Sequence, residues 1–138
     1  MEQSLVLVKP DAMERELAGA ILARLQADGL HLAALRMLHM DRALAERHYA
    51  VHKDKPFFGE LVDYITSTPI VAAVFQGEDA IARIRNIMGA TNPEKAEPGT
   101  IRKDYGIDVQ RNSTHASDSP ENAEIEIAIY FRENEIYG

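Results

Sequence analysis

The chain has 138 residues, of which 46% are hydrophobic, and this suits one compact domain with a sizeable core, which we expect to span residues 1–138. The absence of cysteine excludes disulfides, thiolate metal ligands and a cysteine nucleophile, and the formal net charge of −7 argues against nucleic acid as a specific partner. No apolar run is long enough for a membrane span or a signal-peptide core, so we expect a soluble cytoplasmic protein.

The first elements are a strand and a helix. "SLVLV" (residues 4–8) is a short run of β-forming residues that Lys9-Pro10 ends. The pattern that follows predicts a helix facing the core from Ala12 to Asp28, with Asp11 as its cap. Its apolar residues recur every four positions, at Leu17, Ile21 and Leu25.

The next three elements are a strand and two helices. "LHLAALRMLHM" (residues 30–40) is apolar with broken alternation, which predicts a strand with a bulge near Ala33-Ala34. Asp41 is placed to cap a short helix from Arg42 to about Val51. "FFGELVDYI" (residues 57–65) predicts another helix.

A buried strand, "IVAAVF" (residues 70–75), precedes a helix whose inward residues are Ile81, Ile84 and Met88. Gly89 closes that helix. From Gly89 to Asn112 the periodicity stops, and the segment holds three of the eight glycines and two prolines. A loop of this length in a compact domain is uncommon and usually functional.

The segment "SDSPENAEIEIAIYF" supports two interpretations. Its isoleucines and Phe131 alternate strictly, which favours a strand. However, Ser119-Pro120-Glu121 has the hydroxyl cap, first-turn proline and acid of a helix start, and Ile125 and Ile129 stand four apart. Local pattern alone leaves both open.

His115 lies in "RNSTHASDS", among small side chains that leave its ring accessible. Arg85, Arg102 and Arg111 flank it in sequence, and residues 85–115 carry five basic side chains against four acidic ones. A lone histidine is more often structural, and such arginines more often belong to a solvated surface. An accessible imidazole beside several guanidinium groups can also act as a nucleophile toward phosphorus.

Other motifs are weak or missing. Neither G-x-x-x-x-G-K-[ST] nor G-x-G-x-x-G occurs, so any nucleotide must be held by side chains. His48 and His52 share a helix face and resemble half a zinc site. Tyr49 stands where H-E-x-x-H has Glu, and no third ligand is nearby, so structural zinc is disfavoured.

Several segments together resemble the nucleoside diphosphate kinase family. "NSTHASDSPENAEIEI" is similar to the family's N-x-x-H-[GA]-S-D-S segment, with a Glu at the right distance after it. "LVLVKPDAM" resembles its first strand, "HYAVHKDKPFFGELVDYI" its nucleotide-gripping helix pair, and "IRNIMGATNPEKAEPGTIRKDYG" its long loop. The resemblance covers nearly the whole chain in order.

The resemblance implies a ferredoxin-like α+β fold, with a four-stranded antiparallel sheet, covering helices and a long loop before the catalytic histidine. It also implies that the segment after that histidine is a helix. The family transfers the γ-phosphate of a nucleoside triphosphate, typically ATP, to a nucleoside diphosphate. This ping-pong reaction passes through a phosphohistidine, uses Mg²⁺ and has little base selectivity. The family forms homo-oligomers, tetramers or hexamers.

The resemblance also assigns roles by position. His115 is the expected nucleophile, with Ser117 and Glu126 orienting its imidazole, and Asp118 is expected to reach the metal through water. The residues expected to contact sugar or phosphates are Lys9, Tyr49, His52, Arg85, Thr91, Arg102 and Asn112. The residues expected around the base are Phe57, which stacks on it, and Leu61 and Val109 beside it.

Three features depart from the family pattern. Lys55 stands where Arg is frequent, Ala116 stands where Gly is commoner, and the chain ends at Gly138. Two other functions stay open from the residues alone. One is a ferredoxin-like module that binds nucleotide as a regulatory ligand without turnover. The other, nucleic-acid binding, is disfavoured by the negative charge.

Overall fold

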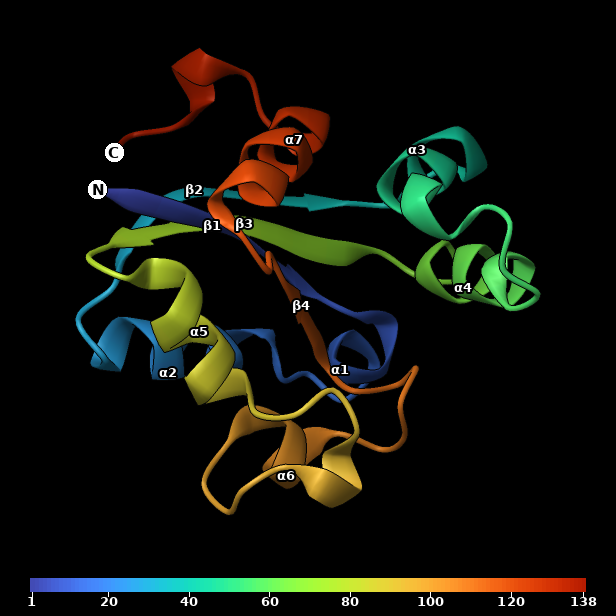
Figure 1. Ribbon diagram of the computed structural model, residues 1–138, viewed down its shortest axis with the longest axis horizontal. Coiled ribbons are helices and arrows are strands. Elements are labelled where there is room, and N and C mark those ends of the chain that lie inside the picture. The colour runs from blue at the N-terminus through green and yellow to red at the C-terminus, as the bar shows by residue number, and fades with distance from the viewer.

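The computed structural model describes residues 1–138 and has one antiparallel sheet with helices on both faces (Figure 1). The strands are β1 (Glu2–Val8), β2 (His31–Leu38), β3 (Ile70–Gly77) and β4 (Thr114–Ala116). They lie in the order β2-β3-β1-β4, so β1, near the N-terminus, pairs with β4, from the last quarter of the chain. The expected ferredoxin-like α+β fold is confirmed.

Helices of different lengths cover the two faces. The helices are α1 (Pro10–Glu14), α2 (Ala18–Ala27), α3 (Arg42–His48), α4 (Phe58–Ile65), α5 (Ala80–Met88), α6 (Ile101–Tyr105) and α7 (Pro120–Tyr130). Helices α3, α4 and α7 pack on one face, and α1, α2, α5 and α6 pack on the other (Figure 1). None of them has the length and apolar character needed to cross a bilayer.

Alternation along β1 divides the core in two. Leu5 and Leu7 point into the cluster under α7, whereas Val6 and Val8 point into the cluster under α2 and α5. This is the period-2 pattern of a strand buried on both faces. Because β1 is central, its end at Val8 delivers Lys9 to the interior.

The predicted helix from Ala12 to Asp28 is wrong in one respect, because the structure breaks it into α1 and α2. Glu16, between them, has a φ of 59°, a left-handed conformation that no continuous helix contains. Asp11 is also not a cap, since it lies inside α1. Its buried carboxylate instead accepts hydrogen bonds from the hydroxyls of Tyr64 and Ser113.

Other local predictions are confirmed with shifted ends. The register of β2 against β3 shifts between Leu32 and Ala34, at the expected bulge. The carboxylate of Asp41 caps α3 by accepting from the Leu44 amide at 2.8 Å. Helix α3 ends at His48 rather than near Val51, and a short 3₁₀ turn (Ala50–His52) follows it.

The long segment between α5 and β4 is less irregular than its composition indicates. It contains a 3₁₀ turn (Pro93–Lys95) and helix α6, where the sequence pattern predicts only loop. The Thr100 hydroxyl caps α6. The C-terminal ambiguity resolves as helix α7, with Pro120 as its first residue and Ser119 as its cap. The helix expected from the resemblance is confirmed.

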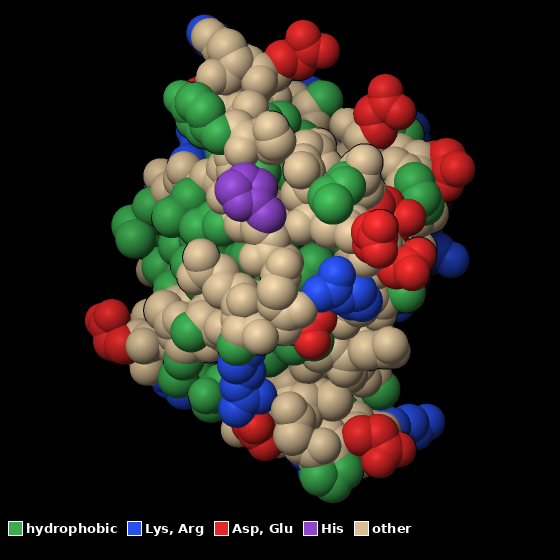
Figure 2. All heavy atoms as spheres, turned by 90° about the vertical axis from the view of Figure 1, so that its left-hand side faces the viewer, with side chains coloured by type: hydrophobic (Ala, Val, Ile, Leu, Met, Phe, Trp, Pro, Cys, Tyr) green, Lys and Arg blue, Asp and Glu red, His purple; other side chains and the backbone are tan.

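The two termini lie on the same side of the molecule (Figure 1). The Tyr137 amide donates to the Ala33 carbonyl at 2.7 Å, which ties the end of the chain to β2. On this side, Asp and Glu side chains gather along one margin, in keeping with the net charge of −7 (Figure 2).

Candidate active site

A cleft of about 530 Å³ opens where the α3–α4 pair, the long loop and α7 meet the ends of β1 and β4. Thirteen of the fourteen residues predicted for the site line it: Lys9, Tyr49, His52, Phe57, Leu61, Arg85, Thr91, Arg102, Val109, Asn112, His115, Asp118 and Glu126. Segments far apart in sequence therefore place their predicted side chains around one cavity.

His115 sits in the middle of β4, opposite Leu7 of β1. Its Nε2 lies 2.9 Å from Oε1 of Glu126 on α7, and its Nδ1 makes no hydrogen bond within the chain. The side chain is 29% exposed, so a ligand in the cleft can reach the ring. A glutamate that accepts from Nε2–H selects the tautomer whose lone pair is on Nδ1.

Ser117 is the one predicted residue that does not line the cleft. It is fully buried, and its hydroxyl donates to Oε1 of Glu126 at 3.1 Å. The same hydroxyl accepts from the Leu5 amide at 3.0 Å. Ser117 therefore connects the central strand to the carboxylate that holds His115, behind the cleft wall.

Lys9 follows β1 directly and is buried. Its Nζ donates to the Gln110 carbonyl at 2.7 Å and to Oδ1 of Asn112 at 2.9 Å. Asn112 in turn donates to the Thr91 carbonyl at 3.0 Å. Burial first, and Arg102 next, lower the pKa of Lys9 from 10.5 to about 8. This buried lysine lines the cleft and loses its proton near pH 8.

Arg102, on α6, is buried and donates to the Gly89 and Thr114 carbonyls, each at 2.9 Å. Burial, and then the nearby Arg85, lower its pKa to about 10, so it stays charged at pH 7. Lys9, Arg47, Arg85 and Arg102 give the lining four cations, against the carboxylates of Asp118 and Glu126. The cleft is thus a positive region in an acidic protein.

Three buried polar side-chain atoms have no hydrogen-bond partner in the chain, and all belong to residues that line the cleft. They are Nδ1 of His52, Nε of Arg102 and Oγ1 of Thr114. Unsatisfied buried polar atoms are costly and rare in folded proteins. Their concentration here is typical of a site organised for a ligand rather than for stability.

The α3–α4 side of the cleft carries aromatic side chains. Tyr49 is partly buried, and burial raises its pKa to about 12. Phe57 is 42% exposed, whereas its neighbour Phe58 packs against the core. Val109, 57% exposed, lies on the same cleft. Two adjacent phenylalanines therefore have different surroundings, and only Phe57 offers its ring to a ligand.

Comparisons with known proteins agree with this geometry. The family model "Nucleoside diphosphate kinase" matches residues 2–136. The chain belongs to the nucleoside diphosphate kinase family. The nucleoside diphosphate kinase of Dehalococcoides mccartyi is 54% identical over 136 residues, 99% of this chain and 96% of that protein. That of Archaeoglobus fulgidus is also 54% identical, over 99% of this chain and 90% of its own length.

Solved structures give the same result. The nucleoside diphosphate kinase of Aquifex aeolicus superposes with a TM-score of 0.95 at 46% identity, covering 98% of each chain. That of Halobacterium salinarum, in complex with CDP, has a TM-score of 0.95 at 45% identity, covering 99% of this chain and 91% of its own. As a member of this family, the chain is an enzyme, a nucleotide-binding phosphotransferase.

Two departures from the nucleoside diphosphate kinase pattern are structurally mild. Ala116 lies in β4 opposite Val6, in the extended region that any residue adopts, so its Cβ causes no strain. Lys55 is exposed and does not line the cleft. Arg111, one of the three arginines that flank His115 in sequence, also lies outside the cleft. It pairs with Asp108 at 2.7 Å on the exposed surface.

Sequence reasoning missed Arg47 and His48 as cleft residues. Arg47 lies two residues before the predicted Tyr49, and no motif distinguishes it from a solvated arginine. The only role that its spacing from His52 indicates for His48 is that of a metal ligand. In the structure its Nδ1 lies 3.0 Å from the Tyr130 hydroxyl, a partner that no local spacing indicates.

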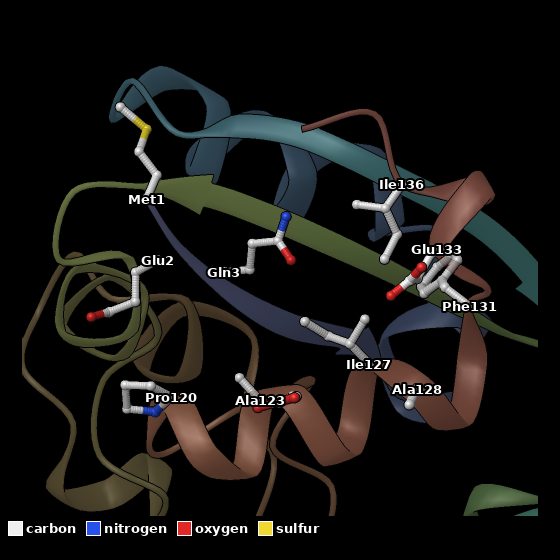
Figure 3. A pocket seen from close by; sticks show the side chains of 11 residues that line it. Met1, Glu2, Gln3, Pro120, Ala123, Ile127, Ala128, Phe131, Glu133 and Ile136 are labelled. Carbon is white, nitrogen blue, oxygen red and sulfur yellow. The ribbon is translucent and has the colours of Figure 1, made fainter.

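A second hollow, of about 460 Å³, lies between the start of β1, helix α7 and the C-terminal tail (Figure 3). Ile127 and Phe131 contribute apolar surface, and the carboxylates of Glu2, Glu124 and Glu133 lie around it. It has no Lys or Arg side chain. The negative charge repels phosphates, so the cleft at His115 is the site that suits the nucleotides of this family.

Proposed function

We propose that this chain transfers the terminal phosphoryl group of a nucleoside triphosphate, typically ATP, to a nucleoside diphosphate through a phosphohistidine at His115. The observation that carries the proposal is the state of that imidazole. Its Nε2 is hydrogen-bonded to Glu126, and its Nδ1 has no partner in the chain. The ring faces a cleft that is lined by four cationic side chains. A neutral nucleophile facing an anion-binding cavity suits phosphoryl transfer.

In the first half-reaction, the Nδ1 lone pair forms a bond to the γ-phosphorus, and the bond from that phosphorus to the β–γ bridging oxygen breaks. The nucleoside diphosphate leaves with the electron pair. The Nε2 proton stays between His115 and Glu126, whose negative charge stabilises the ring as it becomes cationic. In the second half-reaction, a terminal β-phosphate oxygen of another diphosphate attacks the phosphorus, and Nδ1 recovers its lone pair. One site thus serves donor and acceptor in turn.

The positive side chains hold the phosphates during both steps. Arg85, Thr91 and Arg102 act on the β- and γ-phosphates, and their charges and hydroxyl stabilise the negative oxygens of the transition state. Lys9 and Asn112, joined by the 2.9 Å hydrogen bond, contact the sugar hydroxyls and phosphates. Tyr49 and His52 approach the phosphates from the helix pair.

The base is held by stacking. Phe57 offers an exposed ring at the cleft, and Leu61 and Val109 add apolar surface. A π-face and apolar contacts do not distinguish one base from another, since every base has a π-face. This supports little base selectivity. The CDP bound by the Halobacterium salinarum relative is in keeping with a pyrimidine in such a site.

The residues present fit a Mg²⁺ ion that arrives with the nucleotide. Asp118 lines the cleft, and the hydrogen bond from Asn122 lowers the pKa of its carboxyl, so it is ionised. Mg²⁺ is typically bound by one or two carboxylates, phosphate oxygens and waters, which makes Asp118 the residue to hold it through water. When bound, the ion neutralises charge on the phosphate oxygens.

A homo-oligomer, tetramer or hexamer, is part of the proposal. It is supported by the edge strand β2, on which Leu35 and Met37 are 52% and 67% exposed. Exposed apolar side chains on a strand with one unpaired edge are typical of a surface that another chain covers. Light scattering after size-exclusion chromatography measures the assembly directly, and a monomer at micromolar concentration would contradict it.

Labelling with γ-³²P-ATP tests the reaction. The protein is expected to take up an acid-labile, base-stable label and to return it as triphosphate when GDP, CDP or UDP is added. His115→Ala is expected to take up none, whereas His39→Ala, which removes an exposed histidine outside the cleft, is expected to label normally. Nucleotide binding without labelling would instead favour a module that binds nucleotide without turnover.

A further inference from the structure

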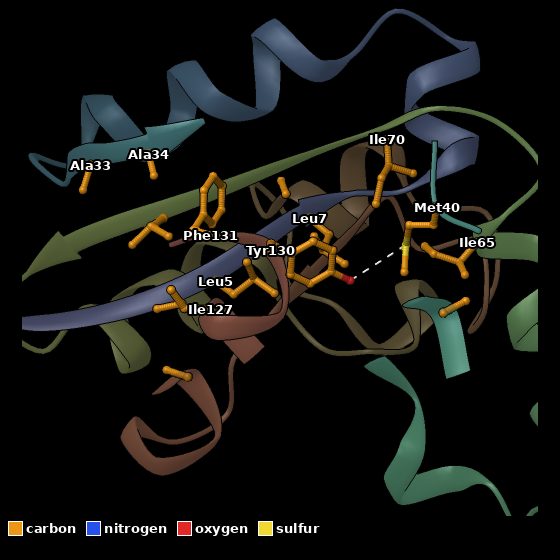
Figure 4. Close-up of a cluster of buried hydrophobic side chains, with 14 of the residues drawn as sticks. Leu5, Leu7, Ala33, Ala34, Met40, Ile65, Ile70, Ile127, Tyr130 and Phe131 are labelled. Carbon is orange, nitrogen blue, oxygen red and sulfur yellow. Dashed lines mark hydrogen bonds between the residues drawn. The ribbon is translucent and has the colours of Figure 1, made fainter. Parts of the chain in front are cut away.

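His48 packs directly against the proposed nucleophile. It is the last residue of α3, and its ring centroid lies 4.8 Å from that of His115, with the planes at 80°. Its Nδ1 lies 3.0 Å from the hydroxyl of Tyr130, which is buried at the end of α7. The same hydroxyl lies 3.8 Å from Sδ of Met40 (Figure 4). His48 is thus held from behind while its ring supports His115.

The hydrogen bond to Glu126 does not fix the His115 ring by itself. The imidazole turns about its Cβ–Cγ bond, a torsion with a broad energy minimum. Nε2 lies closer to that axis than Nδ1 does, so a turn of the ring moves the hydrogen-bonded nitrogen little and redirects the Nδ1 lone pair strongly. In-line attack on phosphorus depends on that direction. An edge-to-face contact with a second ring restrains this rotation.

Helix α7 supports the nucleophile at two points. Glu126 and Tyr130 are four residues apart, so they project from the same face of the helix. Glu126 holds Nε2 of His115 directly, and Tyr130 holds the ring that packs against His115. Burial, followed by the nearby His115 and Lys9, keeps the pKa of His48 well below its usual value. The supporting ring is therefore neutral and adds no charge beside a histidine that becomes cationic.

We propose that His48 is a positioning residue for phosphoryl transfer: its ring, held by the Tyr130 hydroxyl, fixes the plane of the His115 imidazole so that Nδ1 faces the bound phosphate. The proposal rests on the proposed function, because it takes His115 as the nucleophile. It predicts an effect on the chemical step without a matching effect on nucleotide binding.

Single-turnover phosphorylation at saturating ATP, together with ADP binding by calorimetry, separates the two effects. His48→Ala is expected to slow phosphorylation of His115 by about 10- to 100-fold, the cost of a misdirected reacting group. Its Kd for ADP is expected to stay within about twofold of the wild-type value. The control His39→Ala is expected to match the wild type in both measurements, and thermal unfolding verifies that each variant is folded.

Two further variants separate ring contact from general packing. Tyr130→Phe removes the hydroxyl that holds His48 and is expected to slow phosphorylation by about 3- to 10-fold. This variant also carries the test if His48→Ala does not fold. The double variant His48→Phe with Tyr130→Phe keeps both rings and leaves no polar atom unpaired. It is expected to recover the rate to within about fivefold of the wild type.

Three results would overturn the role of His48. One is wild-type phosphorylation in folded His48→Ala, or in Tyr130→Phe where His48→Ala does not fold. Another is a rate loss matched by an equal loss of ADP affinity. The third is a double variant as slow as His48→Ala. A wild-type protein that takes no phosphate on His115 would overturn the proposed function instead, so the two failures are distinguishable.

Discussion

Oε1 of Glu126 lies 2.9 Å from Nε2 of His115 and also accepts the Ser117 hydroxyl, at 3.1 Å. One carboxylate oxygen therefore joins helix α7 to His115, in the middle of β4, and to Ser117, directly after that strand. Because Ser117 is also bonded to the Leu5 amide of the central strand, the carboxylate has little freedom to move. The imidazole is held by a group that the sheet itself positions.

Glu126→Gln tests whether the charge of this carboxylate matters. The amide oxygen can still accept from Nε2–H, but it does not stabilise a cationic ring. We expect phosphorylation of His115 to slow by about 10- to 100-fold, with little change in ADP affinity. Glu124→Gln, an exposed change on the same helix, is the control. Quenched-flow measurements give the rate of His115 phosphorylation in both variants. Equal rates in the two variants would contradict a role for the Glu126 charge.

Nucleotide affinity should depend on the ionisation of Lys9. The lysine is charged below its pKa of about 8 and neutral above it, and the phosphates are anionic throughout. ADP affinity is therefore expected to fall by about 10-fold as the pH rises from 7 to 9.5, as one charge-assisted contact is lost. In Lys9→Met this step should disappear and the affinity should be low at both values. Calorimetry across the range measures it, and an unchanged step in the variant would assign it elsewhere.

The adjacent phenylalanines should separate binding from stability. Phe57→Ala removes a cleft ring and is expected to weaken ADP, GDP and CDP alike, by about 1–3 kcal/mol, without lowering the melting temperature. Phe58→Ala removes a ring packed on the core and is expected to cost about 1–2 kcal/mol of unfolding free energy while leaving nucleotide affinity unchanged. Loss of affinity for only one base would show that Phe57 is not a general stacking surface.

The cap of α7 should contribute measurably to stability. The Ser119 hydroxyl accepts from the Asn122 amide at 3.1 Å. Ser119→Ala is expected to lower the free energy of unfolding by about 1 kcal/mol, whereas Ser119→Asp, which keeps an acceptor, is expected to be close to wild type. Urea titration of the three proteins distinguishes them. If the alanine and aspartate variants were equally stable, the cap would not contribute.

Most helices and strands could be predicted from the sequence, because the residues that start or bury them lie within the elements or directly beside them. Asp41 and Ser119 have side chains that cap the next helix, and β1 alternates between two cores. The break at Glu16 was not predictable, because residues 13–18 all favour helix and no glycine marks the position whose backbone is left-handed. Strand β4 is only three residues long and lies among polar residues, so its pairing with β1 has no local pattern.

Some residues of the site could likewise be predicted from the sequence, and others could not. His115, Arg102 and their partners were located through a motif resemblance over the whole chain, and the structure brings them to one cleft. Arg111 is close to His115 in sequence but does not line the cleft, because it pairs with Asp108 on the surface. The contact of His48 with His115 joins α3 to β4, and no spacing within either segment predicts it.

The most direct test of the account is the position of the phosphorus on the protein after reaction with ATP. NMR of the phosphorylated protein with ¹⁵N-labelled histidine reports which ring nitrogen is bonded to phosphorus. Because Nε2 of His115 is occupied by Glu126, the account predicts phosphate on Nδ1 of His115 alone. Phosphate on Nε2, or on any other residue, would contradict it.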